Sequence, residues 1–162
     1  MTSASLLIPG NTGFLAYLIQ EAVGGNLFSI EVTEPYSNIF SECAGRAGEE
    51  LETNARPALR YNVDNINDYD TVFIGYPVWA NTCPMAVFSF IEENDLSGKT
   101  IFIFSAYGGG SMEKSISDIA AALPGNNVTI ENTFGVSRAD FADARENINA
   151  WLAGLELAPH KK

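Results

Sequence analysis

The feature that most constrains the fold is a regular alternation between short apolar runs and longer segments with helical periodicity. The runs have strand-like composition and lie at Leu27–Val32, Val72–Gly75, Ile101–Ser105 and Val128–Phe134, with a weaker one at Ser5–Ile8. Parallel neighbours in a sheet need crossover connections, which are usually helices. The alternation therefore predicts an α/β fold: a doubly wound, five-stranded parallel sheet with helices on both faces.

The segments between the runs carry apolar residues at spacings of three and four, which places each set on one face of a helix. Three such sets are clear: Phe14, Leu15, Leu18, Ile19 and Ala22; Ile116, Ile119, Ala120 and Leu123; and Phe141, Ala144, Ile148 and Leu152. The less regular segment from Pro35 to Asp70 could hold a further helix with Ile39, Phe40, Cys43 and Ala47 as its apolar stripe.

The strand patterns indicate positions in the sheet. The runs VFIG and IFIFS are apolar throughout, as strands buried on both faces must be, whereas VTIENTF alternates as a half-exposed strand does. We therefore expect the Val72 and Ile101 runs inside the sheet and the Val128 run at its rim.

Length and charge exclude several classes of protein. The chain has 162 residues, no internal repeat and no linker, so we expect a single domain over residues 1–158 followed by a tail at 159–162. The formal net charge of −11 disfavours nucleic acid or an anionic membrane as a partner. No apolar run approaches the ~20 residues of a membrane span, and the first residues lack a basic signal-peptide region, so we expect a cytoplasmic protein.

Histidine and cysteine usage argues against a metal site and against nucleophilic catalysis. His160 is the single histidine, and Cys43 and Cys83 are the two cysteines. We expect no metal site and no residue acting as a catalytic acid, base or nucleophile. Cys83 precedes a predicted helix start, where a thiol pKa can fall, but packing is the favoured role.

Three loops that follow predicted strands have unusual composition. The first, Pro9–Gly13, leads into a helix, so Gly10, Asn11 and Thr12 either bind an anion or form a tight turn capped by Asn11 or Thr12. Lys and Arg are absent from residues 1–45 and 61–98. An anion held there depends on backbone N–H groups and hydroxyls.

The second loop, Tyr76–Pro84, places Trp79 at the end of a strand, where a large apolar side chain either stacks on a ligand or folds back over the core. The third, Ala106–Ser111, contains three consecutive glycines, whose ordering cost favours close backbone approach to a ligand. Together the three loops suit a planar aromatic ligand that bears a phosphate.

Two stretches carry a family resemblance: DYDTVFIGYPVWANTCPMAVFSFIE and LSGKTIFIFSAYGGGSMEKSISDI. They contain the pattern G-x-P-x-W-x-x-x-x-P followed by S-x-x-G-G-x-S. The chain resembles the flavodoxin family in its short form, and the likeness covers most of its length. The resemblance implies strand order 2-1-3-4-5 and one FMN held without a covalent bond.

The resemblance also implies site residues and partners. Gly10, Asn11 and Thr12 match the family's phosphate loop; Pro77, Val78, Trp79, Ala80 and Asn81 match the loop over one flavin face; and Ser105, Tyr107, Gly108, Gly109, Gly110 and Ser111 match the loop along the other edge. The implied role is electron transfer with a redox partner protein or reduction of a small-molecule electron acceptor such as a quinone, and the choice stays open.

The first loop departs from the family pattern S/T-x-T-G-x-T. Leu7 and Pro9 occupy its first two hydroxyl positions. This departure leaves an alternative open, in which the chain keeps the fold as a binding module that holds FMN weakly or not at all.

Overall fold

A computed structural model describes residues 10–109, 111–123, 125 and 133–157. Three parallel strands form its sheet in the order β1-β2-β3: β1 (Thr71–Pro77), β2 (Thr100–Tyr107) and β3 (Thr133–Ser137). The helices are α1 (Asn11–Val23), α2 (Phe40–Glu52), α3 (Met85–Glu93), α4 (Glu113–Ala122) and α5 (Ala144–Ala153), with short 3₁₀ turns η1 (Ile66–Asp68) and η3 (Phe141–Asp143).

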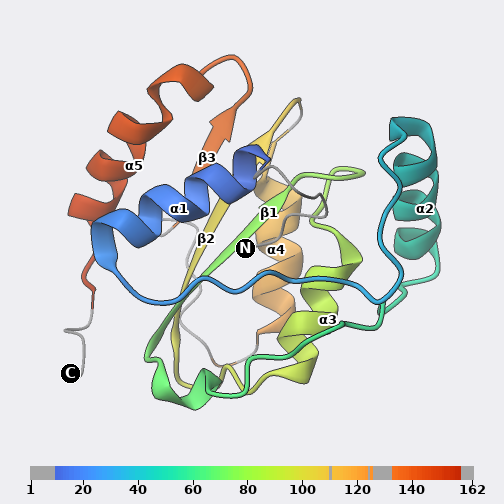
Figure 1. Cartoon of the computed structure of the whole chain (residues 1–162), viewed down its shortest axis with the longest axis horizontal. Coiled ribbons are helices and arrows are strands. Elements are labelled where there is room, and N and C mark those ends of the chain that lie inside the picture. Colours follow the sequence, from blue (N-terminus) through green and yellow to red (C-terminus); the bar gives the residue numbers. More distant parts are fainter. Residues whose placement is uncertain (1–9, 110, 124, 126–132, 158–162) are drawn as a thin grey trace.

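The helices cover both faces of the sheet (Figure 1). On β2, Ile101 and Ile103 share a buried cluster with α3 and α4, whereas Phe104 and Ala106 share one with α1 and α5. Alternate side chains of a strand point to opposite faces, so a continuously apolar run fills both clusters. The predicted burial of this strand on both faces is confirmed, because all six residues from Ile101 to Ala106 are buried.

The prediction of five strands is wrong for the described residues, which form three. The run Leu27–Val32 lies in coil and makes only an isolated bridge between Val32 and Leu59. Its composition is typical of a strand, but a strand also needs a neighbour to complete its backbone hydrogen bonds, and no described strand lies beside it. Ser5–Ile8 and residues 128–132 lie outside the described residues.

The Val72 and Ile101 runs are both strands, as predicted, but only β2 lies inside the sheet: β1 pairs with β2 alone and forms one edge of the sheet in the described residues. β1 and β2 extend the runs at Val72 and Ile101 by a few residues, because Thr71 pairs with Thr100 and Pro77 with Ala106. β3 lies at the rim of the sheet, as expected from its alternating pattern.

The predicted helices are present, with corrections in α1 and α2. Leu15, Leu18 and Ile19 of α1 are buried, but Phe14 and Ala22 of the predicted apolar face are exposed.

The second correction concerns α2. Ala47 is buried and Cys43 half-buried, but Ile39 and Phe40 are 57% and 86% exposed. Ile39 is the residue that caps the helix and Phe40 is its first residue, so both lie at the helix end, away from the core. They therefore do not belong to an inward stripe.

Candidate functional site

The strand-end loops meet along one edge of the sheet. Pro77 at the end of β1 pairs with Ala106, and Tyr107 at the end of β2 pairs with Ser137 at the end of β3. Figure 1 shows α1 beginning at this same end of the molecule. In parallel sheets ligands bind beyond the carboxyl ends of the strands, so this edge is the candidate site.

The start of α1 offers free backbone donors. Gly10 is the capping residue, and the first helical bond runs from the Phe14 N–H to the Gly10 carbonyl at 2.9 Å. No side chain caps this end, so the capping role considered for Asn11 or Thr12 is wrong, and no acidic residue occupies the first turn. Asn11 is exposed and Thr12 buried. The helix dipole and the first N–H groups favour an anion here.

Trp79 opens a tight two-residue turn after β1. Its backbone exchanges two hydrogen bonds with Thr82, of 2.8 and 2.9 Å. Ala80 and Asn81 at the tip have φ values of 48° and 63°, the left-handed region that such turns require. Both tip residues are exposed. A non-glycine residue held there is mildly strained, a feature that functional loops often show.

The base of this turn is anchored to α4. The Thr82 hydroxyl donates to Asp118 at 2.7 Å, and Lys114 Nζ donates to the same Oδ2 at 2.5 Å. Burial opposes ionisation of Asp118, but the bonds from Lys114 and Thr82 outweigh it and lower the carboxyl pKa. The turn is therefore fixed by a charged anchor on its inner side.

Cys83, the next residue, is a packing residue. It is 1% exposed, and burial raises the pKa of its thiol to about 12. A thiol with that pKa is protonated at neutral pH and cannot act as a nucleophile.

Trp79 itself is half-buried and packs edge-on against Tyr36, with ring centroids 5.0 Å apart. The Tyr36 hydroxyl donates to Glu50 at 2.7 Å, and the Arg46 guanidinium lies 4.2 Å from the Tyr36 ring centroid. Burial, and then the Glu50 carboxylate, raise the pKa of the Tyr36 hydroxyl. Trp79 therefore agrees in part with both predicted roles. Its ring packs against the core, as expected for a side chain folded back, and it keeps enough exposure to stack on a ligand.

The glycine loop follows β2. Gly108, Gly109 and Ser111 are exposed and Tyr107 is half-buried, while Gly110 lies outside the described residues. Ser105 is fully buried, and its hydroxyl donates to the Tyr76 carbonyl at 2.6 Å. Its side chain therefore joins β1 to β2, so any ligand contact at Ser105 would use other atoms.

Two residues near this edge have no counterpart among the sequence predictions. Arg138 follows β3, and its guanidinium would lie 3.8 Å from a Cβ placed on Gly108. It makes no ion pair with any carboxylate of the described part of the chain. Tyr36 is the other, in the less regular segment from Pro35 to Asp70, where sequence analysis predicts a helix but no site residue. Neither could be found from sequence, because both reach the site through pairing between distant segments.

The arrangement holds an uncapped helix start, an aromatic turn and a glycine loop with a nearby cation. A sequence model of flavodoxins matches residues 3–153. The chain belongs to the flavodoxin family. No curated protein matches it.

Solved structures support this assignment to the flavodoxins. A candidate flavoprotein from Bacteroides eggerthii DSM 20697 is 30% identical, with a TM-score of 0.79 over 97% of this chain and 95% of that one. A second, from Bacteroides uniformis ATCC 8492, is 29% identical, with the same TM-score over 94% of each chain. A flavoprotein from Lactobacillus acidophilus NCFM in complex with FMN is 19% identical, covers 90% of this chain and 93% of that one, and shares the fold at a TM-score of 0.66.

Within the described residues, no helix is long and apolar enough to cross a membrane.

Proposed function

We propose that this flavodoxin-family chain binds FMN without a covalent bond and passes electrons to a redox partner protein or to a small-molecule acceptor. The observation that carries the proposal is the placement of the Trp79 turn and the glycine loop on the neighbouring strands β1 and β2, beside the start of α1. The Lactobacillus acidophilus neighbour, which shares the fold, is a complex with FMN.

The residues present fit such a ligand. The backbone N–H groups at Asn11 and Thr12 suit the phosphate, because the helix start there is uncapped by any side chain. The half-exposed Trp79 ring suits stacking on the isoalloxazine, and the exposed backbone of Gly108 and Gly109 suits its polar edge. FMN supplies the redox chemistry when bound, and the protein tunes it.

This chain's own side chains have little acid–base work in the proposed reaction. Burial raises the pKa of both the Tyr76 hydroxyl and the Cys83 thiol, and each is engaged in the core. The proposed tasks of the protein are to position the flavin, to exclude water from its ring and to set its potential through nearby charges.

A fluorescence titration of FMN tests the proposal. We expect one saturable site, with quenching of flavin fluorescence on stacking. Trp79→Ala should weaken binding by roughly 5–150-fold, the equivalent of about 1–3 kcal/mol for loss of a stacked aromatic ring. Trp79→Phe keeps the packing against Tyr36 and should lose less.

Tyr61→Ala is the control, because Tyr61 is 60% exposed and lies outside the strand-end loops. Its affinity should match that of the wild type. Equal affinities of Trp79→Ala and wild type would remove Trp79 from the site. Absence of saturable binding up to about 1 mM FMN in a folded wild-type chain would support the alternative, a flavin-free binding module.

A further inference from the structure

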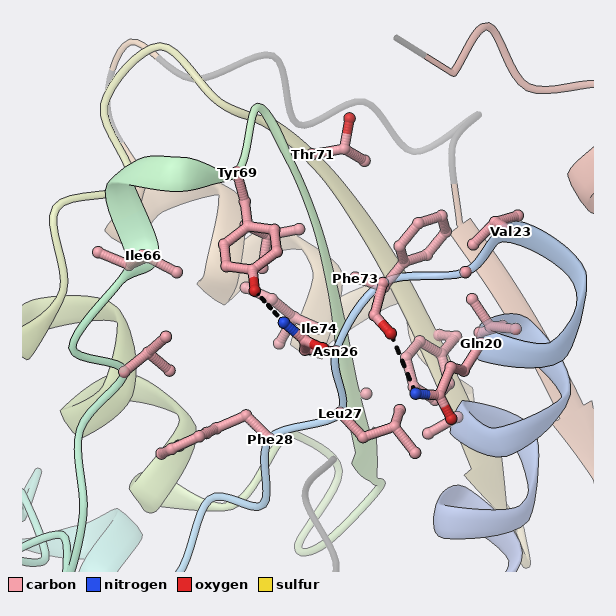
Figure 2. A pocket seen from close by; sticks show the side chains of 18 of the residues that line it. Gln20, Val23, Asn26, Leu27, Phe28, Ile66, Tyr69, Thr71, Phe73 and Ile74 are labelled. Atoms are coloured by element: carbon pink, nitrogen blue, oxygen red, sulfur yellow. Dashed lines mark hydrogen bonds between the residues drawn. The ribbon is translucent and has the colours of Figure 1, made fainter. Parts of the chain in front are cut away.

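The Trp79 turn continues β1, which in the described part of the chain pairs with β2 alone. Beside residues 71–75 of β1 lies an apolar cavity of about 310 Å³, which the coil at residues 24–28 also lines (Figure 2). No described residue of the Trp79 turn or of the glycine loop lines this cavity. The position of the turn therefore depends on contacts made elsewhere.

One face of α4 contacts the chain just before the turn and again at the last residue of the turn. Ser115 Oγ lies 2.9 Å from the Tyr76 hydroxyl, and Asp118 Oδ2 accepts from the Thr82 hydroxyl at 2.7 Å. Ser115 and Asp118 are three residues apart, so they lie on the same face of the helix. Tyr76 and Thr82 are 0% and 1% exposed. α4 therefore holds the Trp79 turn from both of its ends.

The hydrogen bonds at Ser115 have a fixed direction. Its hydroxyl has one hydrogen, which it donates to the Met112 carbonyl at 2.7 Å, so the Tyr76 hydroxyl donates to Ser115 Oγ. The Tyr76 carbonyl accepts from the Ser105 hydroxyl at 2.6 Å. Tyr76 is thus held by β2 at its backbone and by α4 at its side chain.

The same helix carries the glycine loop. Met112, the capping residue of α4, directly follows this loop. A Cβ placed on Gly135 of β3 would lie 2.3 Å from Met112 Sδ and 3.1 Å from a ring carbon of Tyr107. The two residues that flank the glycine loop therefore pack on β3 at Gly135. The Trp79 turn and the glycine loop share one support, which is α4.

Building on the proposed function, we propose that α4 sets the spacing between these two loops, and that Asp118 and Ser115 are positioning residues for the flavin. Each acts through another residue, Asp118 through Thr82 and Ser115 through Tyr76. Removing a negative charge from a protein that binds an anion should tighten binding, whereas removing an anchor that orients the site should weaken it. A positioning role and a purely electrostatic role of Asp118 therefore predict opposite signs.

A fluorescence titration with FMN measures this sign. Asp118→Ala should weaken binding by roughly 3–20-fold, and Ser115→Ala should act in the same direction. Asp118→Asn keeps an acceptor for Thr82 and should recover most of the affinity. Thr82→Val removes the same bond from the other side, so the double variant of Asp118 and Thr82 should bind about as weakly as the weaker single variant. Glu113→Ala is the matched control, because it removes a carboxylate from an exposed position of α4 and should leave the affinity unchanged or slightly higher.

A second measurement needs no flavin. The chain has two tryptophans, Trp79 and Trp151, so fluorotryptophan labelling gives two fluorine NMR signals, which Trp151→Phe assigns. In the chain without FMN, Asp118→Ala should shift or broaden the Trp79 signal and leave the Trp151 signal in place.

The two measurements separate failure of this proposal from failure of the proposed function. A folded wild-type chain that binds no FMN would refute the proposed function. An unchanged Trp79 signal in Asp118→Ala would overturn the positioning role whatever the chain binds, and so would an FMN affinity equal to or above that of the wild type. If Asp118→Ala does not fold, Thr82→Val takes its place in both measurements.

Discussion

At the scale of single residues, close packing inside the sheet explains one glycine of β1. The Phe104 ring of β2 fills the space that a side chain at Gly75 would need. A Cβ placed on Gly75 would lie 2.0–2.6 Å from three ring atoms of Phe104. Phe104 is 2% exposed, and its ring would have to move aside before a methyl group could fit on Gly75. Gly75 is thus required by the neighbouring strand, and the family pattern that contains it has a packing role as well as a functional one.

Gly75→Ala should therefore lower the free energy of unfolding by about 2–3 kcal/mol through overpacking, as measured by urea denaturation. Gly48→Ala makes the same chemical change in α2, where nothing lies within 4 Å, and should be neutral or slightly stabilising. Adding Phe104→Leu to Gly75→Ala should recover part of the loss. Equal stability of Gly75→Ala and wild type would show that the Phe104 ring does not occupy this position.

Cys83 gives a second prediction at this scale. Since burial raises its thiol pKa to about 12, its thiolate fraction at pH 8 should be far below that of free cysteine. A thiol reagent should therefore modify Cys43, which is half-buried, well before Cys83, as mass spectrometry of the native chain can show. The single variants Cys43→Ser and Cys83→Ser assign the rates. Faster modification of Cys83 would contradict the buried thiol.

The same thiol affects stability at high pH. Its folded pKa lies above the unfolded value, so the neutral form stabilises the fold fully below about pH 9, the ordinary thiol pKa, and this contribution is lost as pH rises towards 12.

At the scale of elements, the Trp79 turn stores strain at Ala80, whose φ is 48°. Ala80→Val places a β-branched side chain in the left-handed region and should cost about 1–2 kcal/mol of unfolding free energy. Ala80→Gly should be neutral or stabilise by up to about 1 kcal/mol, because glycine adopts this region freely. Chemical denaturation followed by circular dichroism measures both.

Ala121→Val, on the exposed face of α4, is the control for a valine at a surface site and should cost only about 0.5 kcal/mol. Equal costs at Ala80 and Ala121 would mean that the turn does not hold Ala80 in the left-handed region.

Elements also show which parts of the fold could be predicted from sequence. The run Ile101–Ser105 predicted β2 correctly because an unbroken apolar strand is buried whatever its exact neighbours. The run Leu27–Val32 also has a strand-like composition, yet it lies in coil, because composition does not specify a pairing partner. The three loops could be predicted because their composition is local to each loop. Tyr36 beside Trp79 and Arg138 beside Gly108 could not, because these contacts depend on tertiary packing.

At the scale of the whole molecule, charge sets the expected redox potential. The formal net charge is −11, and one unit charge about 10 Å from the flavin contributes about 1.7 kcal/mol at an effective dielectric of ~20, or roughly 70 mV for one electron. Acidic surroundings disfavour the anionic reduced flavin, so we predict a midpoint potential below that of free FMN. A midpoint above that of free FMN in a potentiometric titration would contradict this account.

Arg138 works against this trend, because it places a cation beside the glycine loop. Arg138→Gln should lower the midpoint by roughly 20–70 mV, with the smaller figure applying if solvent screens the exposed guanidinium. Arg145→Gln is the control, since Arg145 lies in α5 and pairs with Glu21 on the surface at 2.6 Å. A midpoint that stays the same in Arg138→Gln would place this cation away from the flavin.

The central claim is that this member of the flavodoxin family holds FMN at the ends of β1 and β2. The visible absorption spectrum of the purified chain near 450 nm, recorded before and after adding FMN and removing the excess, tests it most directly. The account predicts a flavin band that stays with the protein, perturbed relative to free FMN and weakened in Trp79→Ala. A folded chain that retains no flavin after this treatment and shows no saturable titration would contradict it.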